Sequence, residues 1–190
     1  MKKLFLVAAM ALVTFAGFAQ PKFAHVDIQE VTLLMPESDA ARDAINASQK
    51  EAQETMQAMY EEYQSKVQKY QQNRETWNQT IRESKEKELA DIEQRINEFQ
   101  QNIQQELQSQ QQNLMAPIQK KANEAIAQIA KEGGYVYVFD VNGPVYIDDK
   151  QSVNITPAVR KAVGIPEGRT IESLYEELQA QQQAQQQAQQ

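Results

Sequence analysis

The sequence contains no cysteine. Without a thiol, the chain cannot form a disulfide, a thiolate nucleophile, a zinc–thiolate site or the acylated cysteine of a lipoprotein. Its single histidine, His25, has no neighbours at metal-ligand spacing, so we interpret it as structural. Phosphate-binding glycine loops and nucleophile elbows are also missing, and no carboxylate pair is placed for acid–base work. These absences predict a protein that is not an enzyme, with no catalytic residue, metal or cofactor.

Glycine is missing from residues 36–131, and proline occurs there only as Pro36 and Pro117. The stretch is rich in Gln, Glu, Lys and Ala and carries a thin apolar stripe. So narrow a stripe cannot form the core of a globule. We therefore expect an α+β protein in which residues 36–132 form a long antiparallel α-helical coiled-coil hairpin, a tentacle-like arm on a small β body.

Long hydrophobic runs are also rare, and the longest is at the N-terminus. Lys2-Lys3 precede the apolar run Leu4–Phe15, and Gly17–Ala19 is a small-x-small cleavage site. The run is too short to cross a membrane. Residues 1–19 are therefore predicted to be a signal peptide that is cleaved after Ala19. We expect a periplasmic protein without an integral membrane segment.

The mature chain has an acidic charge. Removing the signal peptide removes two lysines and no acid, which leaves 17 basic and 26 acidic residues and a net charge of −9. Binding to phosphate backbones needs clustered Lys and Arg. The charge therefore speaks against nucleic acid and anionic membrane surfaces as partners.

The small body is expected to come from residues 20–35 and 133–165, at the two ends of the hairpin. In the first part, a strand over Lys22–Ile28 leads into a short helix that ends near Met35. The second part opens with Tyr135–Phe139, which is the strongest strand pattern in the chain.

A β-hairpin is predicted in this second part. Asn142-Gly143 is a typical hairpin dipeptide, and Pro144–Ile147 is the expected returning strand. A closing helix then begins at Thr156-Pro157 and runs to about Val163.

The last segment, residues 166–190, is Gln-rich and expected to be largely disordered. Within it, Ile171, Leu174 and Leu178 have the spacing of one or two amphipathic helical turns, and the run of Ala and Gln from Gln179 onward is expected to be either disordered or a frayed helix. The body before this segment offers only three short strands, which are too few to bury a core alone. We therefore expect an oligomer that joins the strands of several chains, with several arms projecting from one side.

A heptad pattern marks the first helix of the arm. Its predicted seam steps by four and three residues through Met56, Tyr60, Tyr63, Val67 and Tyr70. Weak helix formers cluster over residues 73–80, where we place the turn, and both Asn78 and a Thr80–Glu83 capping box are candidate starts for the second helix.

Pro117 lies inside the apolar pattern of the second helix. Because proline removes a backbone donor and crowds the preceding turn, we expect a kink near residue 117. Pro117 is then either a hinge that lets the arms open or a fixed bend.

Two side chains of the arm are candidates for contact with a bound protein. We place Met59 off the seam and Trp77 near the tip of the arm. A flexible methionine and an amphipathic aromatic ring adapt to many surfaces.

Three stretches of the chain resemble the Skp (OmpH-like) family of periplasmic chaperones for outer-membrane proteins. They are KFAHVDIQEVTLLMPE at 22–37, LMAPIQKKANEAIAQIAKEGGYVYVFD at 114–140 and NITPAV at 154–159. The resemblance implies a homotrimer with a small β body and three helical tentacles around a cavity. It also implies an ATP-independent holdase that keeps unfolded outer-membrane β-barrel proteins in that cavity, and a family without catalytic residues.

The acidic net charge of this chain differs from that of the family's well-studied members, which are strongly basic. The acidic chain makes lipopolysaccharide a doubtful partner and predicts a less electrostatic attraction of clients. The alternative function is a structural coiled-coil adaptor, or spacer of the cell envelope, that binds one folded partner. An apolar seam interrupted by Gln, Glu and Pro117 favours a deformable arm over a stiff spacer.

Overall fold

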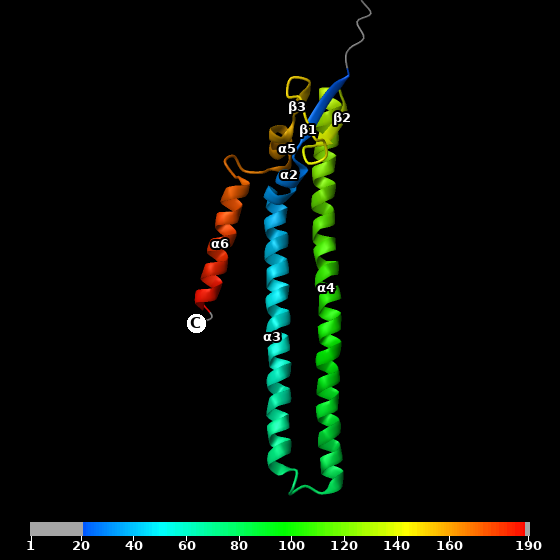
Figure 1. The fold of residues 1–190 in the computed structure, drawn as a ribbon, viewed down its shortest axis with the longest axis vertical. Helices are drawn as coiled ribbons and strands as arrows, with labels where there is room; N and C mark the ends of the chain where they lie inside the picture. Colours follow the sequence, from blue (N-terminus) through cyan, green and yellow to red (C-terminus); the bar gives the residue numbers. More distant parts are fainter. Residues whose placement is uncertain (1–20, 189–190) are drawn as a thin grey trace, which may run out of the picture.

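A two-helix arm projects from a small body at one end of the molecule (Figure 1). The computed structural model describes residues 21–188. The arm consists of α3 (Pro36–Asn73), with 38 residues, and α4 (Gln79–Gly133), with 55 residues. At a rise of ~1.5 Å per residue, α3 alone spans roughly 57 Å. The α+β class, with a helical hairpin on a small β body, is confirmed.

The first arm helix begins at a proline and ends where weak helix formers cluster. Met35 has an extended backbone (φ −61°, ψ 140°), and Pro36 occupies the first turn of α3, where its missing N–H costs nothing. After Asn73, residues 74–78 form the turn, and Asn78 Oδ1 accepts a hydrogen bond from the Ile81 amide at 3.0 Å. This turn lies within the range 73–80 given by the sequence, and its cap is Asn78 rather than Thr80.

The second arm helix ends at a glycine. Gly134 adopts a left-handed conformation (φ 67°), and its amide donates to the carbonyls of Ala130 and Lys131. Pro117 lies within α4, which remains helical on both sides of it. Figure 1 shows α4 as one nearly straight helix, so the kink expected near residue 117 is not seen in this view.

Three parallel strands form the sheet of the body: β1 (Lys22–Val26), β2 (Tyr135–Asp140) and β3 (Ser152–Asn154). β1 is central, and its two neighbours both run parallel to it.

The predicted β-hairpin is wrong, because residues 144–147 form no strand. A local turn does form, with the Gly143 amide donating to the Asp140 carbonyl at 3.0 Å. The chain then passes to the opposite edge of β1 and pairs there as β3. This route brings Ile155, which is 3% exposed, into the core, whereas a hairpin strand on the outer edge of β2 would gain no such burial.

Helices cover one face of the sheet. α2 (Ile28–Leu34) is capped by Asp27, whose Oδ1 accepts from the Glu30 amide at 2.7 Å, and α5 (Thr156–Val163) follows β3. Both helices pack with the body end of α4 against β1. The shared core contains Ala24, Val26, Val31, Leu34, Met35, Ala41, Ile118, Ala122, Ile155, Val159, Val163, Ile165 and Leu174.

The C-terminal segment forms a helix, α6 (Ile171–Ala188), which includes the amphipathic turns expected at Ile171, Leu174 and Leu178. The expectation of disorder is wrong for the described part of the Gln-rich run, which is helical. Leu174 is buried, and Ile171 and Leu178 pack partly buried against the core. Ala and Gln, which follow, are good helix formers and extend the helix once it is anchored. Figure 1 shows α6 pointing in the same direction as the arm.

Candidate functional site: the arm and the open face of the sheet

The seam of α3 follows a heptad. Of the predicted seam residues, Met56, Tyr63, Val67 and Tyr70 are half-buried, and only Tyr60 is exposed. Met59 is half-buried and lies on the seam, whereas Tyr60 is 42% exposed. The placement of Met59 off the seam is therefore wrong, because the step after Met56 is three residues rather than four. The half-buried residues along this stretch are Ala52, Thr55, Met56, Met59, Tyr63, Lys66, Val67, Tyr70, Asn73 and Trp77.

Tyr60 contacts α4 from the rim of the seam. Its hydroxyl accepts a hydrogen bond from Gln100 Nε2 at 2.8 Å, and the same amide nitrogen lies 3.9 Å from Met56 Sδ. Further along the arm, Gln110 Nε2 donates to Ser48 Oγ at 2.8 Å, and both side chains are half-buried. Polar side chains therefore make part of the contact between α3 and α4.

Two tyrosines of α3 donate hydrogen bonds to glutamates of α4: Tyr63 to Glu93 and Tyr70 to Glu86. Each carboxylate raises the pKa of its tyrosine, because ionising the phenol would lose the hydrogen bond and place two negative charges together. These contacts hold the helices together at their exposed edge.

Glu88 accepts hydrogen bonds from two lysines, Lys66 of α3 and Lys85 of α4. The hydrogen bonds from Lys66 and then Lys85 lower the pKa of Glu88 to about 2. A second ion pair crosses the arm between Arg95 Nη2 and Glu62 Oε2 at 3.0 Å. Both pairs are partly exposed, so each contributes little stability and is weakened by salt.

The tip of the arm carries apolar side chains. Trp77 is half-buried and lies against Tyr70, with ring centroids 6.1 Å apart. Ile81, in the first turn of α4, is 41% exposed. Sequence reasoning selected Trp77 as a client contact and placed Ile81 only in the continuing heptad register, although an isoleucine among polar and charged residues at the predicted turn also indicates an exposed apolar contact.

The face of the sheet opposite the helices is aromatic and open. Phe23 on β1 stacks on Tyr137 of β2 with centroids 6.4 Å apart, and Tyr137 lies 6.1 Å from Phe139. Tyr137 is 61% exposed and Phe139 is 43% exposed. We call Phe23, Tyr137 and Phe139 the aromatic face. Sequence reasoning did not select it, although the alternation Tyr135–Phe139 places Tyr137 and Phe139 on one side of a strand.

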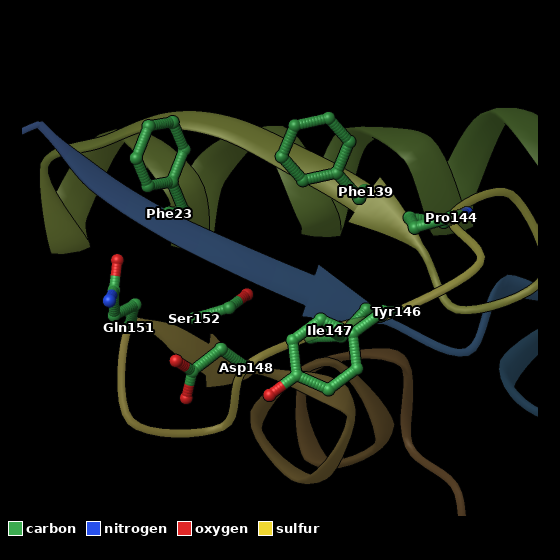
Figure 2. Close-up of a pocket in the computed structure, with 8 residues that line it drawn as sticks. All are labelled: Phe23, Phe139, Pro144, Tyr146, Ile147, Asp148, Gln151 and Ser152. Atoms are coloured by element: carbon green, nitrogen blue, oxygen red, sulfur yellow. The ribbon is translucent and has the colours of Figure 1, made fainter.

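A groove of about 340 Å³ adjoins the aromatic face, between β1 and the loop that leads to β3. Figure 2 shows Phe23 and Phe139 above β1 in the view and Tyr146 on the loop below it. Tyr146 is 79% exposed, and Val145 beside it is fully exposed. The lining residues are Phe23, Phe139, Pro144, Tyr146, Ile147, Asp148, Gln151 and Ser152.

His25 has structural contacts within the sheet. It is 5% exposed, its Nδ1 lies 2.9 Å from Ser152 Oγ, and its Nε2 lies 4.0 Å from Asp149 Oδ1. The first contact ties β1 to β3. Within residues 21–188, no group of three His, Asp or Glu side chains is placed to hold a metal ion.

The helices of the described part of the chain are all too polar or too short to cross a membrane. The predicted signal peptide with its cleavage after Ala19 lies outside the described residues.

The protein is of the α+β class: an arm of two long helices projects from a small parallel sheet, and shorter helices cover one face of that sheet. The family model described as outer membrane protein (OmpH-like) matches residues 22–163. This chain belongs to the OmpH-like family.

A solved structure supports the fold. A crystal structure from Caulobacter crescentus, described as that of an OmpH-like outer membrane chaperone, superimposes with a TM-score of 0.67 at 14% identity. The superposition covers 77% of this chain and 86% of that chain. No curated protein matches the sequence significantly.

Proposed function

We propose that the protein is an ATP-independent holdase chaperone of the periplasm that binds unfolded outer-membrane β-barrel proteins. Membership of the OmpH-like family and the description of the Caulobacter crescentus structure as a chaperone support this role. The observation that carries the proposal is the arm. Two helices of 38 and 55 residues project from a body far smaller than themselves, with long faces that the body leaves uncovered.

The arm suits reversible contact with unfolded chains. Its seam combines apolar residues with Lys66, Asn73 and the Ser48–Gln110 hydrogen bond. Many of the contacts between α3 and α4 are hydrogen bonds and ion pairs between partly exposed polar side chains. Such an arm deforms at low cost, whereas a spacer needs a uniform apolar seam. Holding a client requires many weak contacts and enclosure, and no covalent chemistry.

Enclosure requires several arms, so the proposal includes a homotrimer. The aromatic face and the neighbouring groove support self-association, because Phe23, Tyr137 and Phe139 form an apolar surface that a lone chain leaves in water. Joining these faces would place the three arms on one side of a common body, around a cavity.

Met59 and Trp77 are proposed as client contacts and Pro117 as a hinge. Because Met59 lies on the half-buried seam, we propose that a client contacts the part of its side chain that remains exposed to solvent. Trp77 presents the part of its ring that Tyr70 does not cover.

An aggregation assay tests the holdase proposal. An outer-membrane β-barrel protein unfolded in urea is diluted into buffer with the mature protein, without nucleotide, and turbidity is followed. We expect suppression that saturates at a fixed molar ratio. A globular protein of equal mass is the control for crowding, and a client that precipitates at every ratio would favour the adaptor function.

A further inference from the structure

The C-terminal segment that follows the family match packs onto the root of the arm. The match ends at residue 163, yet Ile165 is 7% exposed and Leu174 is 4% exposed in the same core as the family elements. Ile171 and Leu178 add partly buried contacts, and α6 contacts α2. Beyond Leu178 the chain offers only Ala and Gln, and the side chains described there are exposed.

An arginine links this segment to the first turn of α3. Arg169 is 17% exposed, and its Nη2 lies 2.7 Å from Asp39 Oδ1 and 3.8 Å from Glu177 Oε2. Asp39 also pairs with Arg42. Charge-assisted contacts of this kind, with both partners partly buried, are stronger than those on open surface.

A second arginine links the same segment to the body. Arg160 of α5 pairs with Glu30 of α2 and donates a hydrogen bond to the backbone carbonyl of Arg169. The segment is therefore joined through Arg160 to α2 and α5 and through Arg169 to α3.

The root of α3 has few apolar contacts of its own. Its only fully buried residues are Ser38 and Ala41, and Ser38 Oγ donates to the Thr32 carbonyl. α4, by contrast, buries Ile118 and Ala122 as it enters the body. Of the two arm helices, α3 thus depends more on polar contacts at its root.

We propose that residues 164–178 are a strap that clamps the root of α3 to the body, and that residues 179–188 are dispensable for this clamping. When the Arg169–Asp39 contact is lost, the side chains of Ser38, Arg42 and Glu37 still join the first turns of α3 to the body, but the arm moves more freely at its base. The inference goes beyond the holdase proposal and does not depend on it, since the clamp acts within one chain.

Distances measured by pulsed electron paramagnetic resonance test the strap. The chain has no cysteine, so spin labels attach only at introduced sites: Asn46→Cys on α3 and Ala158→Cys on α5, both exposed in the structure. Labelled protein is diluted with unlabelled protein so that distances between copies do not contribute. We expect Arg169→Ala to broaden the distribution about twofold and to speed amide exchange in residues 38–45 about tenfold.

Two matched controls sharpen the test. Arg95→Ala removes an arginine pair in the middle of the arm, and a chain ending at Leu178 removes only the Gln-rich part; neither is expected to broaden the distribution. An unchanged distribution in Arg169→Ala, or equal broadening in either control, would overturn the proposal. So would an Arg169→Ala protein that circular dichroism shows to be unfolded, because the segment would then be part of the folding core rather than a strap.

Discussion

Tyr70 and Trp77 contact each other at the tip of the arm, with ring centroids 6.1 Å apart and ring planes at 58°. The two residues lie one heptad apart, at the end of α3 and in the turn. Their contact closes the apolar seam just before the chain reverses at Asn78.

Trp77 is the only tryptophan of the chain, so its fluorescence reports on the tip alone. If clients touch the tip, adding an unfolded client that lacks tryptophan shifts the emission of Trp77 to shorter wavelength, because water is displaced from the ring. Trp77→Ala is expected to weaken client binding about threefold to tenfold, in line with ~1 kcal/mol for a partly buried aromatic contact. An emission spectrum that does not shift at a saturating client concentration would show that Trp77 does not contact the client.

Met59 contributes to the stability of the arm as well as to any client contact. Because its side chain is half-buried on the seam, Met59→Ala is expected to lower the free energy of unfolding by about 1–2 kcal/mol, less than a fully buried methionine. Met59→Leu conserves the volume and is expected to change it by less than about 1 kcal/mol. Urea unfolding of both variants checks this.

Client affinity of Met59→Leu then separates the two roles of the side chain. Weaker client binding at unchanged stability assigns Met59 to the contact, through the flexibility that leucine lacks. Equal client affinity of Met59→Leu and the parent chain would show that Met59 only packs the seam.

Glu88 gives the arm an acid-sensitive contact. Its pKa is lowered to about 2 by the hydrogen bonds from Lys66 and Lys85, whereas an unfolded glutamate titrates near 4.5. Since the folded pKa is the lower one, the stabilisation is fully present above about pH 4.5 and is lost as the pH falls towards 2. Melting temperatures between these pH values are expected to fall less steeply for Glu88→Gln than for the parent chain. Glu51→Gln, at an exposed glutamate of α3, serves as the control, and an identical slope in all three proteins would contradict the assignment.

The aromatic face is expected to mediate self-association. Tyr137→Glu would place a charge on the surface that the proposed trimer buries, so it is expected to give a monomer at concentrations where the parent chain is a trimer. Tyr175→Glu is the matched control, since Tyr175 is similarly exposed (56%, against 61% for Tyr137) but lies on α6. Sedimentation velocity distinguishes the outcomes, and a trimer that survives Tyr137→Glu would place the interface elsewhere.

Pro117 is expected to act as a hinge although α4 remains helical through it. Pro117→Ala restores a backbone donor within the helix and is expected to narrow the distribution of arm-to-arm distances between spin labels near the tips. A distribution of the same width in both proteins would leave Pro117 as a helix residue without a hinge function.

The arm was predictable from the sequence because its signals are local. Pro36 opens α3, Asn78 caps α4 and Gly134 ends it, and each of these signals depends on neighbouring residues only. The spacing of apolar residues also located the seam, but it could not choose between Met59 and Tyr60. The steps of a heptad are three or four residues long, so either of two adjacent apolar residues fits the pattern. Only packing against α4 decides which of the two is buried.

The sheet was not predictable in the same way, because its pairing is long-range. Asn142-Gly143 does make a turn, yet residues 144–147 pair with nothing and Ser152–Asn154 pair with β1. The aromatic face likewise depends on β1 and β2 meeting across more than a hundred residues. The strap depends on contacts between Arg169 and Asp39, and no spacing in the sequence indicates them.

Light scattering gives the mass of the mature protein alone and after mixing with a urea-diluted outer-membrane β-barrel protein, and this measurement tests the holdase function most directly. We expect three copies of the chain alone and a soluble complex of three copies with one client, under conditions where the client alone aggregates. A client that precipitates while the mass of the protein stays unchanged would contradict the holdase function.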